Sequence, residues 1–248
     1  MSAATSSVAT RPARPGLASG ERRARIGIID SGVHAEHPHV GNICGGVAIT
    51  ATGRDPSFVD RLGHGTAVAA LIHQRAPQAE LFVVKVFHDS LVTNLATILT
   101  AIDWCIDQNM DLINLSLGTT NEDHRAAFAS AVACGRAKGV VIVSAAEMQD
   151  VPALPGSLPG VVGVLADATK EASEFGAEVC HGKTVYMASP YPREIPGVPR
   201  ECNLRGISFA VAHMTATLAN LWNPAWSVNE PESLLASVSK PRAKAAQP

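Results

Sequence analysis

The chain has 248 residues, of which 46% are hydrophobic and 17% charged, and its formal net charge is −2. This length allows one large α/β domain or two small ones, and the composition provides for a sizeable core. The slight negative charge, without a long basic run, argues against a nucleic-acid-binding protein. No stretch reaches the ~18 consecutive apolar residues that a membrane-spanning helix needs.

The cysteines and the two ends of the chain bear on its compartment. The cysteine count is odd and no CxxC pair occurs, which predicts free thiols in a reducing compartment. The N-terminal segment is rich in Ala, Ser, Arg and Pro and lacks the apolar region of a signal peptide. We therefore expect disordered tails over residues 1–21 and 241–248, one domain over 22–240, and a cytoplasmic location.

The first predicted element is a buried strand over residues 25–30, a short β-branched run that ends in Asp30. Aspartate at the carboxyl end of a central strand occupies the place where α/β sheets bind ligands. Asp30-Ser31-Gly32 is equally typical of a turn. Both interpretations stay open from this stretch alone.

Three closely spaced histidines, His34, His37 and His39, follow this strand. Histidine is a common transition-metal ligand, but Pro38 prevents a helix that would align the three rings. No cysteine or carboxylate stands at a recognisable ligand spacing, so a solvated loop is favoured over a metal site.

His64 stands between Gly63 and Gly65 and begins an apolar run of small residues over 67–72, which predicts a buried helix. The flanking glycines let other backbone approach closely. His64 is therefore either a surface or capping residue or a catalytic base.

Beyond this helix the pattern alternates between strands and helices. We expect strands over 81–86, 112–116, 140–143 and 161–165, and helices over 94–109 and 125–138. Nearly continuous apolar strands separated by helices predict a mainly parallel sheet covered on both faces, a three-layer α/β/α sandwich. Neither GxGxxG nor GxxxxGK[ST] occurs, so no phosphate-binding loop is indicated.

Ser208 begins a second apolar helical run, which continues to Leu221, and Gly206 before it suits a tight turn. A hydroxyl at a helix N-terminus lies where the free N–H groups favour developing negative charge, as a nucleophile requires. Serine is also a favoured N-cap residue. The stretch by itself does not distinguish the two roles.

Taken together, Asp30, His64 and Ser208 form a candidate triad in the chain order Asp, His, Ser. An α/β-hydrolase would need G-x-S-x-G with the acid and the histidine after the serine. Here residues 206–210 end in alanine and only about 40 residues follow Ser208, so that fold is excluded.

At these motifs the chain resembles the subtilisin-like serine peptidases, the subtilases, over about residues 25–222. Asp30-Ser31-Gly32 with His37-Pro38 resembles the aspartate motif of the family, and residues 63–66 resemble its histidine motif. Residues 206–210 with His213 resemble the serine motif. The resemblance implies that Ser208 attacks a peptide carbonyl, that His64 accepts and returns the proton, and that Asp30 orients the imidazole.

The resemblance also implies a partner and excludes others. A peptide or protein substrate would bind as an extended strand beside Ser116, Leu117 and Gly118, with Ala145 and Gly156 as further substrate-binding positions. We expect no cofactor and no metal, and neither nucleic acid nor membrane as a partner. The oligomeric state stays open.

The sequence departs from the family pattern at the oxyanion hole. Glu147 stands where the family has glycine, and Met148 stands where it has the oxyanion-binding asparagine. A thioether cannot donate a hydrogen bond, and loss of one such donor costs roughly 10²–10³ in kcat in subtilisin itself. Gln149 is a substitute donor if the loop shifts, and Glu147 would repel the oxyanion unless it turns away.

A calcium site known from many secreted members is not expected either. His39 stands in the place of an aspartate ligand, and residues 72–77 pass directly to the next strand without the calcium-binding loop. The usual folding prodomain does not precede the first strand, which together with the missing signal peptide predicts an intracellular member.

Two functional hypotheses follow. The first is a serine endopeptidase, weak or narrow in specificity, that processes a precursor peptide. The second is a pseudopeptidase that binds a partner peptide in a biosynthetic or regulatory pathway with little turnover. The candidate triad favours the first hypothesis, and Glu147-Met148 favours the second.

Overall fold

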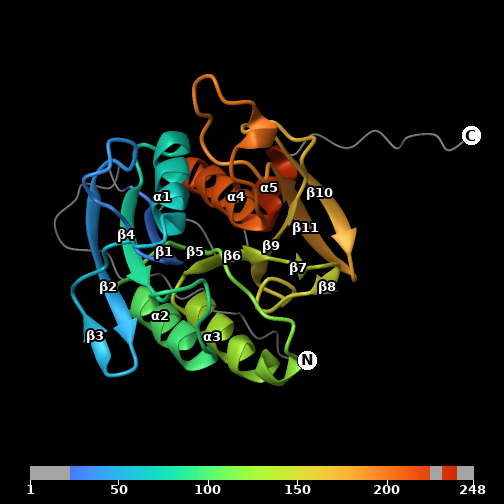
Figure 1. Ribbon diagram of the computed structural model, residues 1–248. Coiled ribbons are helices and arrows are strands. Elements are labelled where there is room, and N and C mark those ends of the chain that lie inside the picture. Colours follow the sequence, from blue (N-terminus) through green and yellow to red (C-terminus); the bar gives the residue numbers. More distant parts are fainter. Residues whose placement is uncertain (1–22, 224–230, 239–248) are drawn as a thin grey trace, which may run out of the picture.

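The computed structural model describes residues 23–223 and 231–238 (Figure 1). Both predicted tails, 1–21 and 241–248, lie outside the described residues, as do residues 22, 239 and 240 at the ends of the predicted domain. None of the helices in the described part combines the length and the apolarity that crossing a membrane requires.

All of the predicted strands and helices form, but further strands follow one another without a helix between them, from β1 to β3 and from β6 to β11. The strands are β1 (Arg25–Asp30), β2 (Ile43–Thr50), β3 (Gly53–Asp55), β4 (Glu80–Lys85), β5 (Leu112–Leu115), β6 (Val141–Ala145), β7 (Glu147–Met148), β8 (Val151–Pro152), β9 (Val161–Ala166), β10 (Phe175–Cys180) and β11 (Lys183–Ala188). The helices are α1 (His64–Arg75), α2 (Leu95–Asp107), α3 (Arg125–Ala137), α4 (Ile207–Leu221) and α5 (Pro231–Val238), with 3-10 turns η1 (Glu122–His124) and η2 (Arg200–Cys202).

One large sheet of nine strands in the order β10-β11-β9-β6-β5-β1-β4-β2-β3 forms the middle of the domain. The strands from β11 to β2 pair in parallel, and β10 and β3 join the two edges in antiparallel hairpins. β7 and β8 form a separate two-stranded hairpin. Because β1 and β5 are neighbours, residues that follow their carboxyl ends meet at one edge of the sheet.

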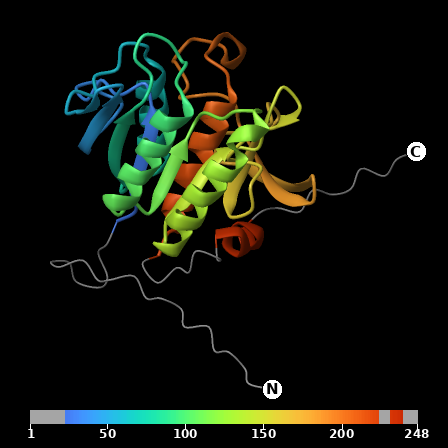
Figure 2. The same cartoon turned by 90° about the horizontal axis from the view of Figure 1, so that it is seen from below.

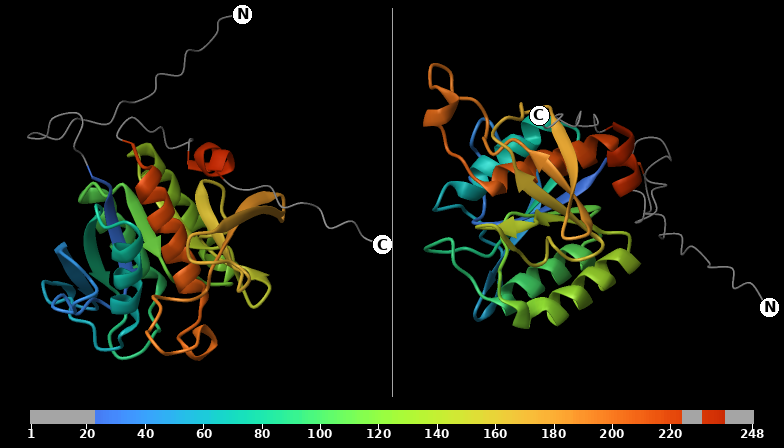
Figure 3. Two further views of the ribbon diagram at one scale, coloured as in Figure 1. Left: turned by 90° about the horizontal axis from the view of Figure 1, so that it is seen from above. Right: turned by 90° about the vertical axis from the view of Figure 1, so that its right-hand side faces the viewer.

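Helices cover both faces of this sheet, which confirms the predicted three-layer α/β/α sandwich (Figures 1 and 3). α1 and α4 pack together on one face, and α2 and α3 lie side by side across the other (Figure 2). Alternate residues of β1 serve the two layers: Ile26 and Ile28 join the core under α1 and α4, whereas Ile29 joins the core under α2 and α3. All of these side chains are fully buried.

The edge hairpins were not predicted. β2 contains two consecutive glycines, Gly45 and Gly46, which weaken a strand pattern. β10 is only partly buried along its length, so it lacks the continuous apolar run of the central strands. The short β7–β8 hairpin depends on a turn at Gln149 and Asp150, both with positive φ (53° and 62°), which gives no hydrophobic signal.

Candidate active site

Asp30 and His64 form a direct hydrogen-bonded pair. Asp30 ends β1 and is fully buried, and its Oδ1 lies 2.7 Å from His64 Nδ1. The same Oδ1 accepts a hydrogen bond from the backbone N–H of Ser31 at 2.7 Å. Asp30 therefore both ends the strand and holds the imidazole, and it leaves His64 Nε2 as the nitrogen for proton transfer.

The surroundings of His64 favour its protonated form. Burial alone lowers the pKa of the imidazole, but the hydrogen bond that it donates to Asp30 and the negative charges of Asp30 and Asp60 outweigh burial and raise the pKa above its usual value. This is the direction that a base needs if it is to carry the proton of the nucleophile while the reaction proceeds.

Asp60 fixes the start of the histidine helix, a role that the sequence analysis missed. Its Oδ1 accepts backbone hydrogen bonds from Leu62 (2.9 Å) and Gly63 (3.0 Å), and its Oδ2 accepts from the N–H (2.9 Å) and hydroxyl (2.6 Å) of Thr66. An aspartate just before the helix is a recognisable capping signal. Asp60 thus satisfies the N–H of Thr66 in the first turn of α1 and fixes the backbone just before the N-cap residue Gly63.

Ser31 connects this cap to the aspartate strand. Its hydroxyl donates to Asp60 Oδ1 at 2.9 Å and accepts from the N–H of Gly65 at 2.8 Å. A Cβ on Gly65 would lie 2.2 Å from the carbonyl oxygen of Gly32. The glycine after His64 is therefore needed for close backbone approach, as predicted.

Ser208 lies in the first turn of α4 and is not its N-cap. The cap is Gly206, in an extended conformation (φ 176°) that any residue adopts, so the expected tight turn is wrong. Ser208 Oγ donates to the carbonyl oxygen of Ser116 at 3.3 Å. Within the described residues it makes no hydrogen bond to His64, so the hydroxyl must rotate toward the imidazole before attack; free enzymes often show such loose geometry.

A buried polar network ties the end of β5 to the serine helix. Thr215 Oγ1 donates to Asn114 Oδ1 at 2.9 Å, and Asn114 Nδ2 donates to Ser116 Oγ at 2.7 Å. Ser116 Oγ in turn donates to the carbonyl oxygen of Ser208 at 3.4 Å. These bonds hold the segment after β5 against the first turn of α4 and so position Ser208.

A cavity of about 840 Å³ brings most of the predicted site residues together. It is lined by the triad members His64 and Ser208 and by the predicted substrate-binding residues Ser116, Leu117, Gly118 and Ala145, together with Met148. Much of the rest of its wall is apolar and comes from the segment between β4 and α2, with Phe87, Leu91 and Val92, and from the start of α2, with Leu95 and Ile98.

Three of the predicted site residues do not line this cavity: Asp30, which is fully buried behind His64, and Gln149 and Gly156. Gln149 occupies the exposed two-residue turn of the β7–β8 hairpin, away from the cavity lining. Gly156 is buried against β6, where a Cβ would lie 1.8 Å from the carbonyl oxygen of Ala145. Gly156 therefore acts through close packing on Ala145, which does line the cavity.

Met148 faces the cavity from the hairpin and is 40% exposed. Its Sδ lies 3.5 Å from the position that a Cβ on Gly118 would take, so the thioether borders the segment at which a substrate would bind. The side chain at the position of the oxyanion-binding asparagine thus reaches the site, but it brings no donor.

Comparison with known proteins decides the family. The sequence profile of the subtilase family matches residues 21–246. The chain belongs to the subtilase family. Among similar proteins, the thermostable alkaline protease of Halalkalibacterium halodurans is 30% identical over 210 residues, which cover 79% of this chain and 56% of that protein.

Other relatives show the same likeness over different shares of their length. Subtilisin DY of Bacillus licheniformis is 28% identical over 239 residues, covering 87% of this chain and 83% of that protein. The minor extracellular protease Epr of Bacillus subtilis is 31% identical over 180 residues, 68% of this chain but only 27% of Epr. The chain thus spans about half of the alkaline protease and about a quarter of Epr, and its membership supports serine peptidase activity at the level of the family.

Glu147 of this subtilase turns away from the cavity. It adjoins Met148 on β7, and neighbouring side chains on a strand point to opposite faces. Its Oε1 accepts a hydrogen bond from Cys180 Sγ at 2.8 Å and lies 3.4 Å from His181 Nε2. The carboxylate therefore points away from the cavity, which reduces the repulsion of an oxyanion that its charge would otherwise cause.

The remaining histidines of the motifs have structural roles. His34, His37 and His39 are exposed in the loop after β1, as the sequence favoured. His213 is buried on α4, where burial lowers its pKa to about 4 against the opposing hydrogen bond to the carbonyl of Tyr191. It is therefore neutral at ordinary pH and takes no part in proton transfer.

Proposed function

We propose that the chain is a serine endopeptidase that hydrolyses peptide bonds through Asp30, His64 and Ser208. The observation that supports it most directly is the 2.7 Å hydrogen bond between Asp30 and His64, beside a cavity that Ser208 also lines. Ser208 Oγ would attack the carbonyl carbon while its proton passes to His64 Nε2, which then protonates the leaving amine. A water molecule would then attack the acyl-enzyme while His64 accepts its proton. The imidazole would return that proton to Ser208 Oγ as the acid product leaves.

The substrate would lie extended along the segment after β5. Ser116, Leu117 and Gly118 continue past the end of that strand and line the cavity. Leu91 and Val92, which are 52% and 77% exposed, form part of the facing wall. A peptide with apolar side chains would cover this surface, so we propose a narrow preference for such peptides.

We propose that turnover of generic peptides is slow. The backbone N–H of Ser208 lies in the first helical turn and serves as one donor to the oxyanion. Met148 supplies no second donor, and Gln149 does not line the cavity. Loss of one donor reduces kcat by roughly 10²–10³, which suits the processing of one precursor peptide in the cytoplasm better than general digestion.

The alternative function is a pseudopeptidase that holds a partner peptide. It is favoured by the hydrogen bond of Ser208 Oγ to the carbonyl of Ser116 and by the missing oxyanion donor at Met148. In this case the cavity binds the peptide, but the resting hydroxyl seldom reaches His64.

A fluorophosphonate probe distinguishes the two functions, because it reacts only with an activated serine. We expect covalent labelling of the wild-type chain at Ser208, identified by peptide mass, and none in Ser208→Ala. Ser173→Ala, at an exposed serine outside the site, serves as the matched control and should label normally. Absence of wild-type labelling together with retained peptide binding would favour the pseudopeptidase.

A further inference from the structure

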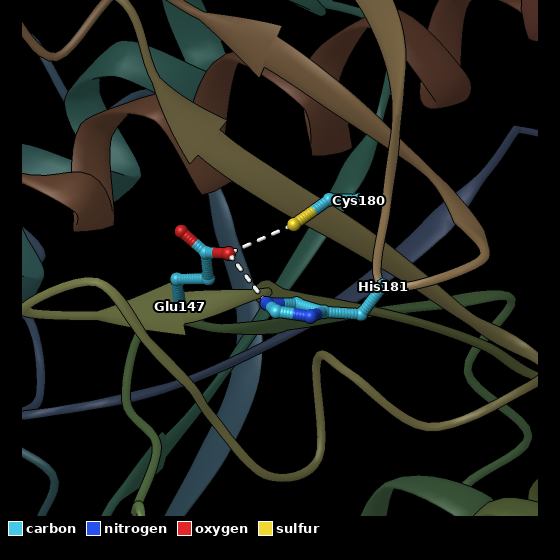
Figure 4. Close-up of side chains that lie close together, drawn as sticks. All are labelled: Glu147, Cys180 and His181. Atoms are coloured by element: carbon cyan, nitrogen blue, oxygen red, sulfur yellow. Dashed lines mark hydrogen bonds and ion pairs between the residues drawn. The ribbon is translucent and has the colours of Figure 1, made fainter.

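Three metal-ligating side chains converge between two hairpins, outside the triad (Figure 4). Glu147 comes from β7, Cys180 is the last residue of β10, and His181 follows it in the turn to β11. Glu147 Oε1 lies 2.8 Å from Cys180 Sγ and 3.4 Å from His181 Nε2, and all three ligand atoms lie within 4.8 Å of one another.

Both hairpins hold these side chains on defined backbone. Cys180 pairs with Lys183 across a two-residue turn in which His181 and Gly182 have positive φ (48° and 75°). This is the tight turn that matches the twist of an antiparallel pair. Glu147 pairs with Pro152 across the equally short turn of the other hairpin. Glu147 and Cys180 therefore sit on paired strands and His181 on a tight turn, and none of the three lies on a long loop.

The spacing suits a tetrahedral zinc ion. Zinc bonds of about 2.0–2.3 Å place tetrahedral ligand atoms roughly 3.4–3.7 Å apart. The oxygen–nitrogen separation of 3.4 Å already agrees with this value. The oxygen–sulfur separation of 2.8 Å is that of a hydrogen bond and needs to open by less than about 1 Å once the thiol proton is gone.

The charges around the thiol suit a cation as well. The Cys180 thiol donates its hydrogen bond to Glu147 Oε1, so a carboxylate already lies against the sulfur. A divalent ion would take the place of the proton that now joins sulfur and oxygen. Lys183, opposite Cys180, directs its ammonium elsewhere, to the carbonyl oxygens of Gly156 (2.6 Å) and Leu158 (2.7 Å).

We propose that Glu147, Cys180 and His181 bind a borderline-soft divalent cation of the zinc type. The three side chains supply one thiolate, one imidazole and one carboxylate ligand, and water fills the fourth position. On binding, the thiol proton leaves to solvent, and no oxidation or reduction occurs. A thiolate and an imidazole disfavour calcium, which prefers oxygen ligands. Sequence spacing gave no sign of this site, because Glu147 is 33 residues from Cys180.

None of the three proposed ligands lines the active-site cavity, but the proposed metal site lies next to it in the structure. Met148, which lines the cavity, follows Glu147 directly on β7. A bound ion would therefore fix the hairpin that carries Met148 to the edge hairpin β10–β11.

Cobalt titration of the metal-free protein tests the site, since Co²⁺ reports thiolate ligation by a near-ultraviolet charge-transfer band. We expect this band to saturate at one Co²⁺ per chain and to vanish on addition of Zn²⁺. Cys180→Ser should abolish the band. Glu147→Gln and His181→Gln should weaken Co²⁺ affinity by about 10-fold or more, the scale at which changes around metal sites act.

Matched control variants and a second measurement distinguish loss of the metal site from misfolding of a variant. Cys134→Ser and His39→Gln change an exposed cysteine and an exposed histidine outside the site and should leave the titration unchanged. Added Zn²⁺ should raise Tm of the wild type and of both controls, but not of Cys180→Ser. The proposal is overturned if no thiolate band forms at one equivalent, or if the band survives Cys180→Ser.

Discussion

The two sides of the active-site cavity differ in how closely they keep to the subtilase pattern. On one side, β1, α1 and α4 present Asp30, His64 and Ser208, with Asp30 and His64 in a 2.7 Å hydrogen bond. On the other side, the β7–β8 hairpin presents Met148 where the family has an amide donor. The first side holds the residue pair that the proposed attack needs, whereas Met148 offers no side-chain donor for the proposed oxyanion.

The difference follows the architecture. Asp30 ends a central buried strand, and His64 and Ser208 lie at the starts of helices packed against the sheet, so changes there disturb the core. Met148 sits on an exposed hairpin of two-residue strands, where substitution costs the fold little.

The largest expected effect concerns the side of the cavity that carries Asp30, His64 and Ser208. Ser208→Ala should remove hydrolysis of any peptide substrate, because triad members act as a unit and their loss costs roughly 10⁶ in kcat in subtilisin. The measurement is kcat/KM with Ser173→Ala as control, since that serine is exposed and outside the site. Full activity of Ser208→Ala would mean that another residue is the nucleophile.

Asp30→Asn should reduce kcat by about 10⁴-fold, because an amide at Oδ1 favours the wrong imidazole tautomer. Asp55→Asn is a suitable control at an exposed aspartate. Circular dichroism should show that both variants fold. A loss no greater than that of the control would remove Asp30 from the catalytic mechanism.

The third change tests the hairpin side. Met148→Asn places an amide donor on a side chain that already faces the cavity, and we expect kcat/KM on a model peptide to rise by about 10-fold or more. Such a rise corresponds to about 1.4 kcal/mol of transition-state stabilisation.

Glu147→Gly added to Met148→Asn should give little further gain, because Glu147 is directed to Cys180 and His181. Gln149→Ala is the matched control and should leave the rate unchanged, since Gln149 does not line the cavity. If the wild type already matches an ordinary subtilase and Gln149→Ala slows it, Gln149 completes the oxyanion hole instead.

A smaller effect concerns the pH dependence set by His64. The pKa of His64 is raised, so the imidazole stays protonated at pH values above the usual histidine pKa of about 6.5. The acidic limb of kcat/KM should therefore have its midpoint above that value. By the same sign, the His64–Asp30 pair stabilises the fold fully below about pH 6.5 and loses this contribution as pH rises through the folded pKa.

Nuclear magnetic resonance of the imidazole protons in Ser208→Ala measures this pKa directly. His213, with its pKa lowered to about 4, provides an internal reference on the same helix layer. A His64 midpoint at or below about 6.5 would contradict the predicted influence of Asp30.

The smallest expected effect is that of calcium. Residues 76–79 alone connect α1 to β4, and His39 is exposed in its loop, so neither half of the calcium site is provided. Added Ca²⁺ should leave the Tm of metal-free protein unchanged within error, whereas Zn²⁺ should raise it. A Ca²⁺-dependent rise of several degrees would reveal an oxygen-ligand site that the sequence does not indicate.

Local patterns of the sequence were sufficient for the central sheet and the catalytic motifs. The apolar runs at β1, β5, β6 and β9 predicted their strands, because strands buried on both faces consist mostly of apolar residues. The order of Asp30, His64 and Ser208, with the glycines around His64, indicated the subtilase family before any geometry was known.

Only the tertiary structure decided features that depend on contacts between distant segments. The network from Thr215 through Asn114 to Ser116 joins residues whose sequence spacing carries no signal. The tight turn at Gln149 and Asp150 places Met148, and neither Glu147 nor Gln149, in the wall of the cavity. Glu147, Cys180 and His181 come together only because two short hairpins meet at the edge of the sheet. Hydrophobic periodicity determines which strands form, whereas tight turns and packing determine which polar side chains meet.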